Sequence, residues 1–239
     1  MPTTFSLGDT YILAEYIYLD KAEANRFRLA NIEIPVPQYV RIEPQDSQAA
    51  KDIRTRLEIA NPTRHLYTMA QPYEAVAYNA YFLATRELSG VGWNRPAPWW
   101  PDCSGLRIGM PGDLVPGFST RGSEPFAAME LLYEGSFVKT STENCALYRS
   151  LIPSYEERKS PWHNRYMYCI PFGVQSGYYP ASTPMGEGNL NRIMKKDMRF
   201  IIQPCGGSTT NPRVWIYLWA ETYNIFRVYG GRGTLLFNY

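Results

Sequence analysis

The sequence predicts an all-β protein in which two antiparallel sheets pack face to face, and three observations support this. Aromatic residues are abundant, with 19 Tyr, 10 Phe and 6 Trp among 239 residues, and such a composition favours strands. The 19 Pro and 18 Gly place turn signals at short intervals. Stretches in which apolar and polar residues alternate, the period of a half-buried strand, recur along the chain. Because 45% of the residues are apolar, the chain can bury a sizeable core.

The first predicted strand covers residues 10–19 (TYILAEYIYL), where Ile, Tyr and Leu predominate. A short helix is predicted next, over residues 21–30, because Asp20 and Glu23 have the spacing of a capping box. We expect Phe27 to be on the inward face of this helix.

Proline and alternation define the elements that follow. The Ile-Pro-Val-Pro sequence at 34–37 is expected to stop the helix, because proline lacks the backbone N–H. Further strands are predicted at 38–43, 53–59, 64–70, 126–133, 136–139, 165–172, 197–203, 213–221 and 222–229. Residues 142–152 are predicted as either a short helix or an extended segment, and residues 72–88 are ambiguous. Roughly eight to ten strands separated by turns indicate a sandwich or jelly roll. We therefore predict an antiparallel eight-stranded jelly-roll sandwich with short helices and long loop insertions.

One long insertion is predicted over residues 89–125, within a single domain that spans residues 1–239. This stretch is dense in Gly and Pro and is too long for an ordinary connection between strands. Trp93, Trp99 and Trp100 are expected to be exposed there. They belong either to a loop that packs on itself or to a contact with another subunit.

Charge and hydropathy exclude several classes of protein. The net charge is +2 and no long run of one sign exists, so strong nucleic-acid binding is not expected. The first twenty residues lack the basic and apolar regions of a signal peptide. No stretch approaches the ~18 apolar residues that a membrane span requires. The four cysteines, at positions 103, 145, 169 and 205, lie too far apart for a metal or redox motif and are expected to be separate thiols.

Catalytic signatures are weak throughout. The only two histidines, His65 and His163, lie far apart in sequence, and a metal site would need clustered ligands. The Gly230–Gly233 sequence lacks the spacing of a phosphate loop, so it is predicted to be a turn between terminal strands. We predict no enzyme, no catalytic residue, no metal and no cofactor. A carbohydrate-binding, lectin-like jelly roll is the alternative function, with Trp99 and Trp100 stacking on sugars.

Three stretches, taken in order, resemble one family of proteins. The first is Tyr16-Ile17-Tyr18-Leu19-Asp20, followed by a charged helix that contains Arg26-Phe27. The second is GNLNRI at 188–193, which is similar to the family's N-F-S-R-I-D segment, although Met194 stands where the family has Asp. The third, residues 215–237, resembles the family's closing strands and Gly-rich turn. Between them, residues 130–137 and 165–168 resemble two further strands of the family. The family is that of the double jelly-roll major capsid proteins of nucleocytoplasmic large DNA viruses.

The resemblance covers the C-terminal jelly-roll half of such a protein, and a complete double jelly roll needs about twice this length. It implies a structural capsid protein in trimeric, pseudo-hexagonal capsomers of an icosahedral shell. The implied partners are copies of the chain, a second jelly-roll chain and other capsid proteins. The implied location is the virion, with assembly in the host cytoplasm. Residues matching the family motifs are expected to hold the opening and closing strands: Tyr16, Tyr18, Asp20, Asn189, Arg192, Tyr223, Asn224 and Arg227.

Overall fold

The fold was analysed in a computed structural model, which describes residues 11–73, 84, 124–135, 137–156, 166–174, 183, 186, 188–202 and 211–237. The predicted insertion at 89–125 lies outside the described residues except for its last two positions. Trp93, Trp99, Trp100 and His163 also lie outside them.

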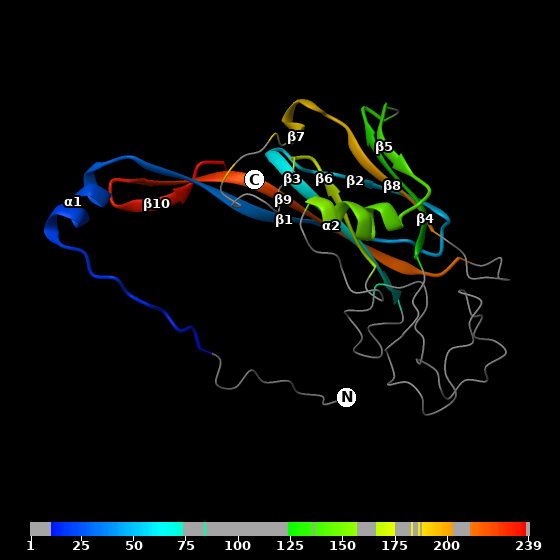
Figure 1. The fold of residues 1–239 in the computed structure, drawn as a ribbon, viewed down its shortest axis with the longest axis horizontal. Coiled ribbons are helices and arrows are strands. Elements are labelled where there is room, and N and C mark those ends of the chain that lie inside the picture. The colour runs from blue at the N-terminus through cyan, green and yellow to red at the C-terminus, as the bar shows by residue number, and fades with distance from the viewer. Residues whose placement is uncertain are drawn as a thin grey trace.

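Two antiparallel sheets make up the body of the molecule (Figure 1). The larger sheet has the order β1 (Ile32–Asp46), β9 (Val214–Tyr229), β3 (Pro62–Pro72), β6 (Met167–Pro171), with β7 (Gly188–Asn189) beside β3 and β10 (Arg232–Leu235) beside β9. The smaller sheet has the order β2 (Asp52–Arg56), β8 (Lys196–Ile202), β4 (Phe126–Tyr133), β5 (Phe137–Thr142).

The strand order confirms the predicted jelly roll. When the short β7 and β10 are set aside, the first, eighth, third and sixth of the eight main strands form the larger sheet. The second, seventh, fourth and fifth form the smaller one. The chain therefore crosses repeatedly between sheets, as an antiparallel double-sheet jelly roll requires.

The core lies between the sheets, and alternating burial is clearest in β8 and in the first half of β9. In β8 every second residue is buried, so that Met198, Phe200 and Ile202 point inward. Phe126 of β4 packs against Phe200 with ring centroids 4.8 Å apart, and against Tyr168 of β6 at 5.3 Å. Alternation of this kind is the signal from which the strands were predicted, because successive side chains of a strand point to opposite faces.

Most predicted strands are confirmed, with shifted ends. The segments predicted at 213–221 and 222–229 form one continuous strand, β9, because pairing with β1 continues across Glu221 and Thr222 without a turn. β2 ends at Arg56, although Leu57 and Ile59 remain in the core. The segment 142–152, predicted as either a short helix or an extended segment, is largely helical. A π-helix at Leu147–Leu151 leads into α2 (Ile152–Glu156).

The predictions for the N-terminal region are partly wrong. The strand predicted at 10–19 is absent over residues 11–19, which are extended, exposed and not paired with either sheet. The helix is confirmed as α1 (Lys21–Leu29), and the backbone N–H of Glu23 donates to the Asp20 side chain at 2.8 Å. Phe27 does not face inward, because no residue of α1 is buried and Phe27 is 43% exposed.

The prolines at 34–37 do not stop the helix, which ends before them, but lie within β1. β1 is an edge strand of the larger sheet. Proline is tolerated at such an edge because one side of the strand needs no donor.

Candidate assembly interface

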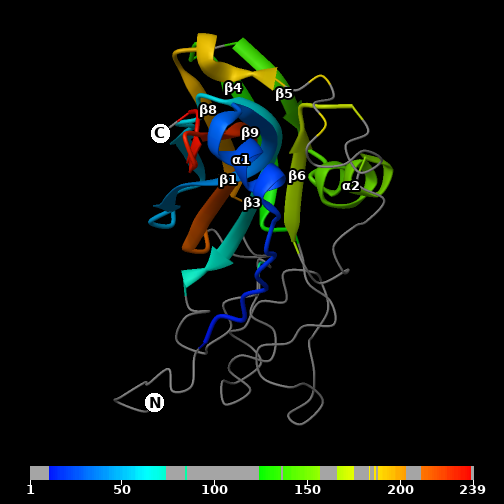
Figure 2. The same cartoon turned by 90° about the vertical axis from the view of Figure 1, so that its left-hand side faces the viewer.

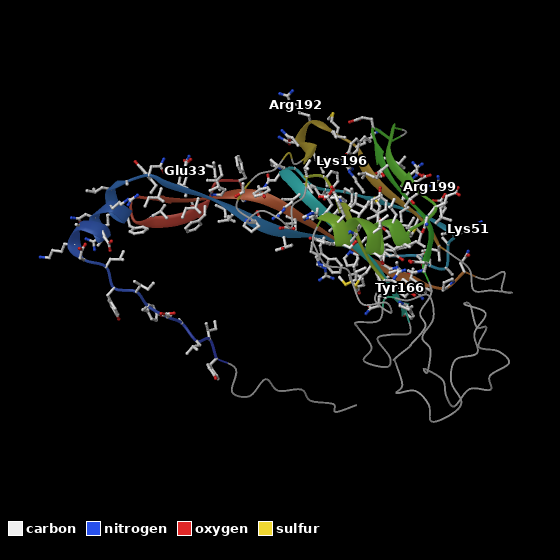
Figure 3. The ribbon with its side chains drawn as sticks, viewed as in Figure 1. Glu33, Lys51, Tyr166, Arg192, Lys196 and Arg199 are labelled. Carbon is white, nitrogen blue, oxygen red and sulfur yellow. The ribbon has the colours of Figure 1, made fainter. Side chains whose placement is uncertain are left out.

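An arm projects from one end of the two-sheet body. We define it as α1, the first part of β1 (32–37), the end of β9 (225–229), and β10. Figure 1 shows the arm extending away from the body with α1 at its tip, and Figure 2 shows α1 in front of the body when viewed along the arm. In Figure 3 the labelled Glu33 lies on the arm, whereas Lys196 and Arg199 lie on the body.

Strand pairing on both sides of β9 and a glycine turn after it form the arm. β9 continues beyond the body because β1 pairs with it on one side, from Ile32↔Val228 inward, and β10 pairs with it on the other. The connection between β9 and β10 needs residues with positive φ, and Gly230 (φ 59°) and Gly231 (φ 76°) supply them. The turn predicted for this Gly-rich sequence is thus confirmed.

The base of the arm is fixed by Asn224, which is 1% exposed. Its amide nitrogen donates to the Gln38 side chain at 2.8 Å and to the carbonyl of Phe237 at 2.6 Å. Its side-chain oxygen accepts from the backbone N–H groups of Ile225 and Phe237. One buried amide thereby joins β1, β9 and the residues after β10.

Three more family-motif residues lie on or beside the arm. The Tyr223 hydroxyl, next to Asn224, donates to the carbonyl of Thr183 at 2.8 Å. Arg227 donates to Glu33 across the β1–β9 pair at 2.6 and 2.9 Å. Asp20 caps α1. Because the Arg227–Glu33 pair is solvent-exposed, it contributes little to stability.

Asn189 and Arg192 lie in a second group, beside the start of β3. Asn189 pairs with Pro62, and its side chain accepts from the N–H of Asn191 at the start of a 3₁₀ turn, Leu190–Arg192. Arg192 points away from the body (Figure 3). Tyr16 and Tyr18 belong to neither group, because both are exposed in the segment before α1.

A buried lysine that sequence analysis missed supports this 3₁₀ turn. The sequence analysis made no prediction for Lys196, but its ammonium donates to the carbonyls of Leu190 and Ile193 at 3.0 and 2.9 Å. Burial lowers the pKa of Lys196, as does the nearby Arg56 charge, while Glu134 opposes the shift. The sequence held one signal for this buried lysine: Lys196 occupies an inward-facing position of the alternating strand β8.

Large apolar side chains are exposed mainly on the arm and on residues 11–19, which we call the N-terminal segment. Six of the segment's side chains are 78–94% exposed: Tyr11, Ile12, Leu13, Tyr16, Ile17 and Tyr18. On the arm, the exposed apolar residues are Phe27, Leu29, Ile34 and Tyr229, and Leu236 and Phe237 are exposed directly after β10. Contiguous exposure of this kind marks surfaces for protein interaction.

A buried ionic cluster joins β3 to β9 within the body. The pairing of β3 with β9 has a bulge between Thr63 and His65. At this bulge two successive residues, Arg64 and His65, both contact Glu221. His65 Nδ1 lies 2.8 Å from Glu221, Arg64 donates at 3.5 Å, and the Tyr67 hydroxyl donates at 3.3 Å. Although burial acts to raise the pKa of Glu221, the hydrogen bond and charge of His65 and the charge of Arg64 hold it below its ordinary value.

A second polar cluster anchors the helical segment to the core. Arg149 donates to Glu124 at 2.6 Å, and the buried Tyr168 hydroxyl donates to the other oxygen of Glu124. Cys145 and Cys169 are separate, buried thiols, as predicted. Burial, with the Glu124 charge, raises the pKa of Cys145 to about 12, so this thiol is not a nucleophile at neutral pH.

Within the described ranges, no group of three or more His, Cys, Asp or Glu side chains could hold a metal ion. A helix long and apolar enough to cross a membrane is likewise absent from that part of the chain. The feature that stands out is therefore the exposed apolar surface of the arm and the N-terminal segment.

Solved structures of viral capsids share this architecture. The PBCV-1 virus capsid matches with a TM-score of 0.62 and 16% identity, over 94% of this chain and 56% of that chain. PBCV-1 VP54, fitted into a reconstruction of the virophage Sputnik, matches over the same shares at a TM-score of 0.64. This is the fold of a viral capsid jelly roll. The Faustovirus major capsid protein also matches, at 0.55 and 14% identity, over 81% of this chain and 33% of that chain.

The resemblance to double jelly-roll capsid proteins of large DNA viruses is therefore confirmed at the level of the fold. The chain spans 56% of the length of the PBCV-1 capsid chains. No protein-family model and no curated protein matches this sequence.

Proposed function

We propose that this chain is a structural capsid protein of a large DNA virus, contributing a jelly roll to trimeric, pseudo-hexagonal capsomers of an icosahedral shell. The observation that carries the proposal is the likeness of the whole described fold, over 94% of the chain, to PBCV-1 capsid structures. The chain acts in the virion after assembly in the host cytoplasm, and it has a structural rather than a catalytic role.

The partners are copies of this chain, a second jelly-roll chain and other capsid proteins. A capsid subunit buries much of its surface against its neighbours, and stable interfaces have apolar, aromatic-rich centres. The arm and the N-terminal segment offer such a surface. We further propose that residues 1–239 act as one domain, and that Trp93, Trp99 and Trp100 add to a subunit contact.

The test is the solution mass of the purified chain, measured by light scattering during size-exclusion chromatography at several concentrations. Trimers, hexamers or larger shells support the capsid role, and electron microscopy would reveal their symmetry. Leu29→Asp on the arm is expected to reduce association. Leu151→Asp is the matched control, because Leu151 is also exposed (64% against 83%) but lies on the π-helix of the body. A monomer at all concentrations, alone and with capsid partners, contradicts the proposal.

A further inference from the structure

The strands of the arm form a ribbon in the order β1, β9, β10, and the two outer edges of this ribbon differ. The carbonyl of Ile225 in β9 accepts the N–H of Leu236, directly after β10, at 2.8 Å. Successive residues of an antiparallel strand turn their N–H and C=O groups to opposite edges. In this part of β9, the odd-numbered residues therefore bond toward β10 and the even-numbered residues bond toward β1.

Proline closes the edge that β1 forms. Ile32 and Ile34 pair with even-numbered residues of β9, so their backbone groups face inward. The residues that turn their backbone groups to the outer edge are therefore Glu33, Pro35 and Pro37. Because proline has no N–H, two of these three outward positions cannot donate to a further strand, and prolines at such positions protect a sheet edge from pairing.

The edge that β10 forms is open. Thr234 pairs with Arg227, an odd-numbered residue of β9, so its backbone groups face inward. Those of Gly233 and Leu235 consequently face outward, and neither residue is a proline. Among the described residues no strand pairs with this edge of β10, which Figure 1 shows within the arm. A row of unpaired N–H and C=O groups is a template for another strand.

We infer that β10 pairs antiparallel with β10 of a second copy of this chain, across a twofold axis at Thr234. Two ribbons then become one continuous sheet, in which the open edge of each satisfies the other. This inference rests on the proposed function and names one of its contacts. A trimer contains no twofold axis, so the contact joins chains that belong to two different capsomers.

The sequence of β10 suits this register. Gly233 lies opposite Leu235 of the second copy, and the reverse, so the outward backbone groups of both residues are paired. Thr234 lies opposite Thr234 of the second copy, and such cross-strand threonine pairs are favourable. Arg232 lies opposite Leu236 of the second copy, so the pairing places no like charges against each other. The β1 edge offers no equivalent site, because its prolines lack the donors.

The experiment traps the contact with an engineered disulfide in the full chain. Thr234→Cys places two thiols opposite each other on the axis, where the Cα atoms of a non-hydrogen-bonded pair lie about 4.5 Å apart, within disulfide range. Arg232→Cys is the matched control, because Arg232 is also exposed and lies on the same face of β10. Its two copies are offset by four residues, or about 13 Å, which is too far for a disulfide. Chains are oxidised at concentrations at which they assemble, and linked dimers are quantified on non-reducing gels beside the wild-type chain.

Thr234→Cys is expected to give at least about tenfold more linked dimer than Arg232→Cys, because only the former meets the disulfide geometry. Adding Leu235→Pro should abolish the cross-link, since it removes an outward N–H that β9 does not use. Adding Glu33→Pro, which removes an outward N–H from the closed edge, should leave the cross-link intact. Equal yields from the two cysteine variants overturn the pairing. Assembly of capsomers without the cross-link at position 234 would overturn the pairing and leave the capsid role standing. Cross-linked dimers that never assemble further would do the reverse.

Discussion

The two-sheet body and the arm differ in where they place large apolar side chains. In the body, alternation sends one face of each strand into a shared core, where Phe126, Phe200 and Tyr168 are almost completely buried. In the arm, β1, β9 and β10 continue the same strand pairing, but none of the residues 225–229 is fully buried. Backbone pairing alone therefore does not bury the arm's side chains. The apolar side chains of the body stabilise the fold of one chain, whereas we propose that those of the arm contact another chain.

The largest effect on stability is expected in the core of the body. Phe200→Ala removes a ring that stacks on Phe126 and should lower the free energy of unfolding by about 3–5 kcal/mol. Phe27→Ala on α1 is the matched change in the arm, where the ring is already 43% exposed, and it should cost less than about 1 kcal/mol. Urea denaturation of both variants measures the difference. Equal losses would contradict the division into a packed body and an uncovered arm.

The ionic cluster of the body should give the next largest effect. Glu221→Gln leaves Arg64 and His65 without their shared carboxylate, and removing one partner of a buried ion pair costs about 3 kcal/mol. Because the pKa of Glu221 is lower in the folded chain than its ordinary value of 4.5, its stabilisation is present above that value and is lost as pH falls through the folded pKa.

Thermal unfolding between pH 7 and pH 3 checks this dependence. The wild-type chain should lose more stability below about pH 4.5 than the Glu221→Gln variant does, so the two curves converge in acid. Arg227→Ala on the arm is the control, since its exposed pair with Glu33 contributes at most about 1 kcal/mol. Parallel pH curves for Glu221→Gln and the wild-type chain would contradict the role of Glu221.

Sequence periodicity predicted the body well because burial there follows from alternation. The segments 126–133 and 197–203 were predicted as strands almost to the residue, and they form β4 and β8 at the centre of the smaller sheet. The length of β9 was missed: two strands were predicted although the residues at 221–222 carry no turn signal, and pairing with β1 and β3 shows that the strand continues.

The N-terminal segment shows the limit of the same reasoning. Its composition predicts a strand, but strand formation needs a partner edge, and among the described residues neither sheet supplies one. Contacts between residues far apart in sequence, such as that of His65 with Glu221, have no local signal either. Sequence pattern reports what a segment prefers, whereas pairing depends on what lies beside it.

Asn224 joins the two regions, and its replacement should have an intermediate effect. Asn224→Ala removes the bonds to Gln38 and Phe237 and should cost about 1–3 kcal/mol, because buried polar groups lose their partners. Hydrogen exchange should accelerate in β10 and in the end of β9, with little change in β4 and β8. Asn191→Ala, at an exposed position, is the control. Uniform acceleration over both sheets would show that Asn224 supports the whole fold rather than the arm.

The smallest effect on stability is expected in the N-terminal segment, where Tyr18 is 94% exposed. Tyr18→Ser should change the free energy of unfolding of the isolated chain by less than about 0.5 kcal/mol, because almost no contact is lost. The same change should weaken association, since aromatic anchors often dominate interface energies. Urea denaturation at low concentration measures the first quantity, and light scattering at high concentration measures the second. A residue that matters for assembly but not for folding is what the contrast between the packed body and the exposed N-terminal segment requires. A large loss of stability in the isolated chain would mean that the segment already packs on its own jelly roll.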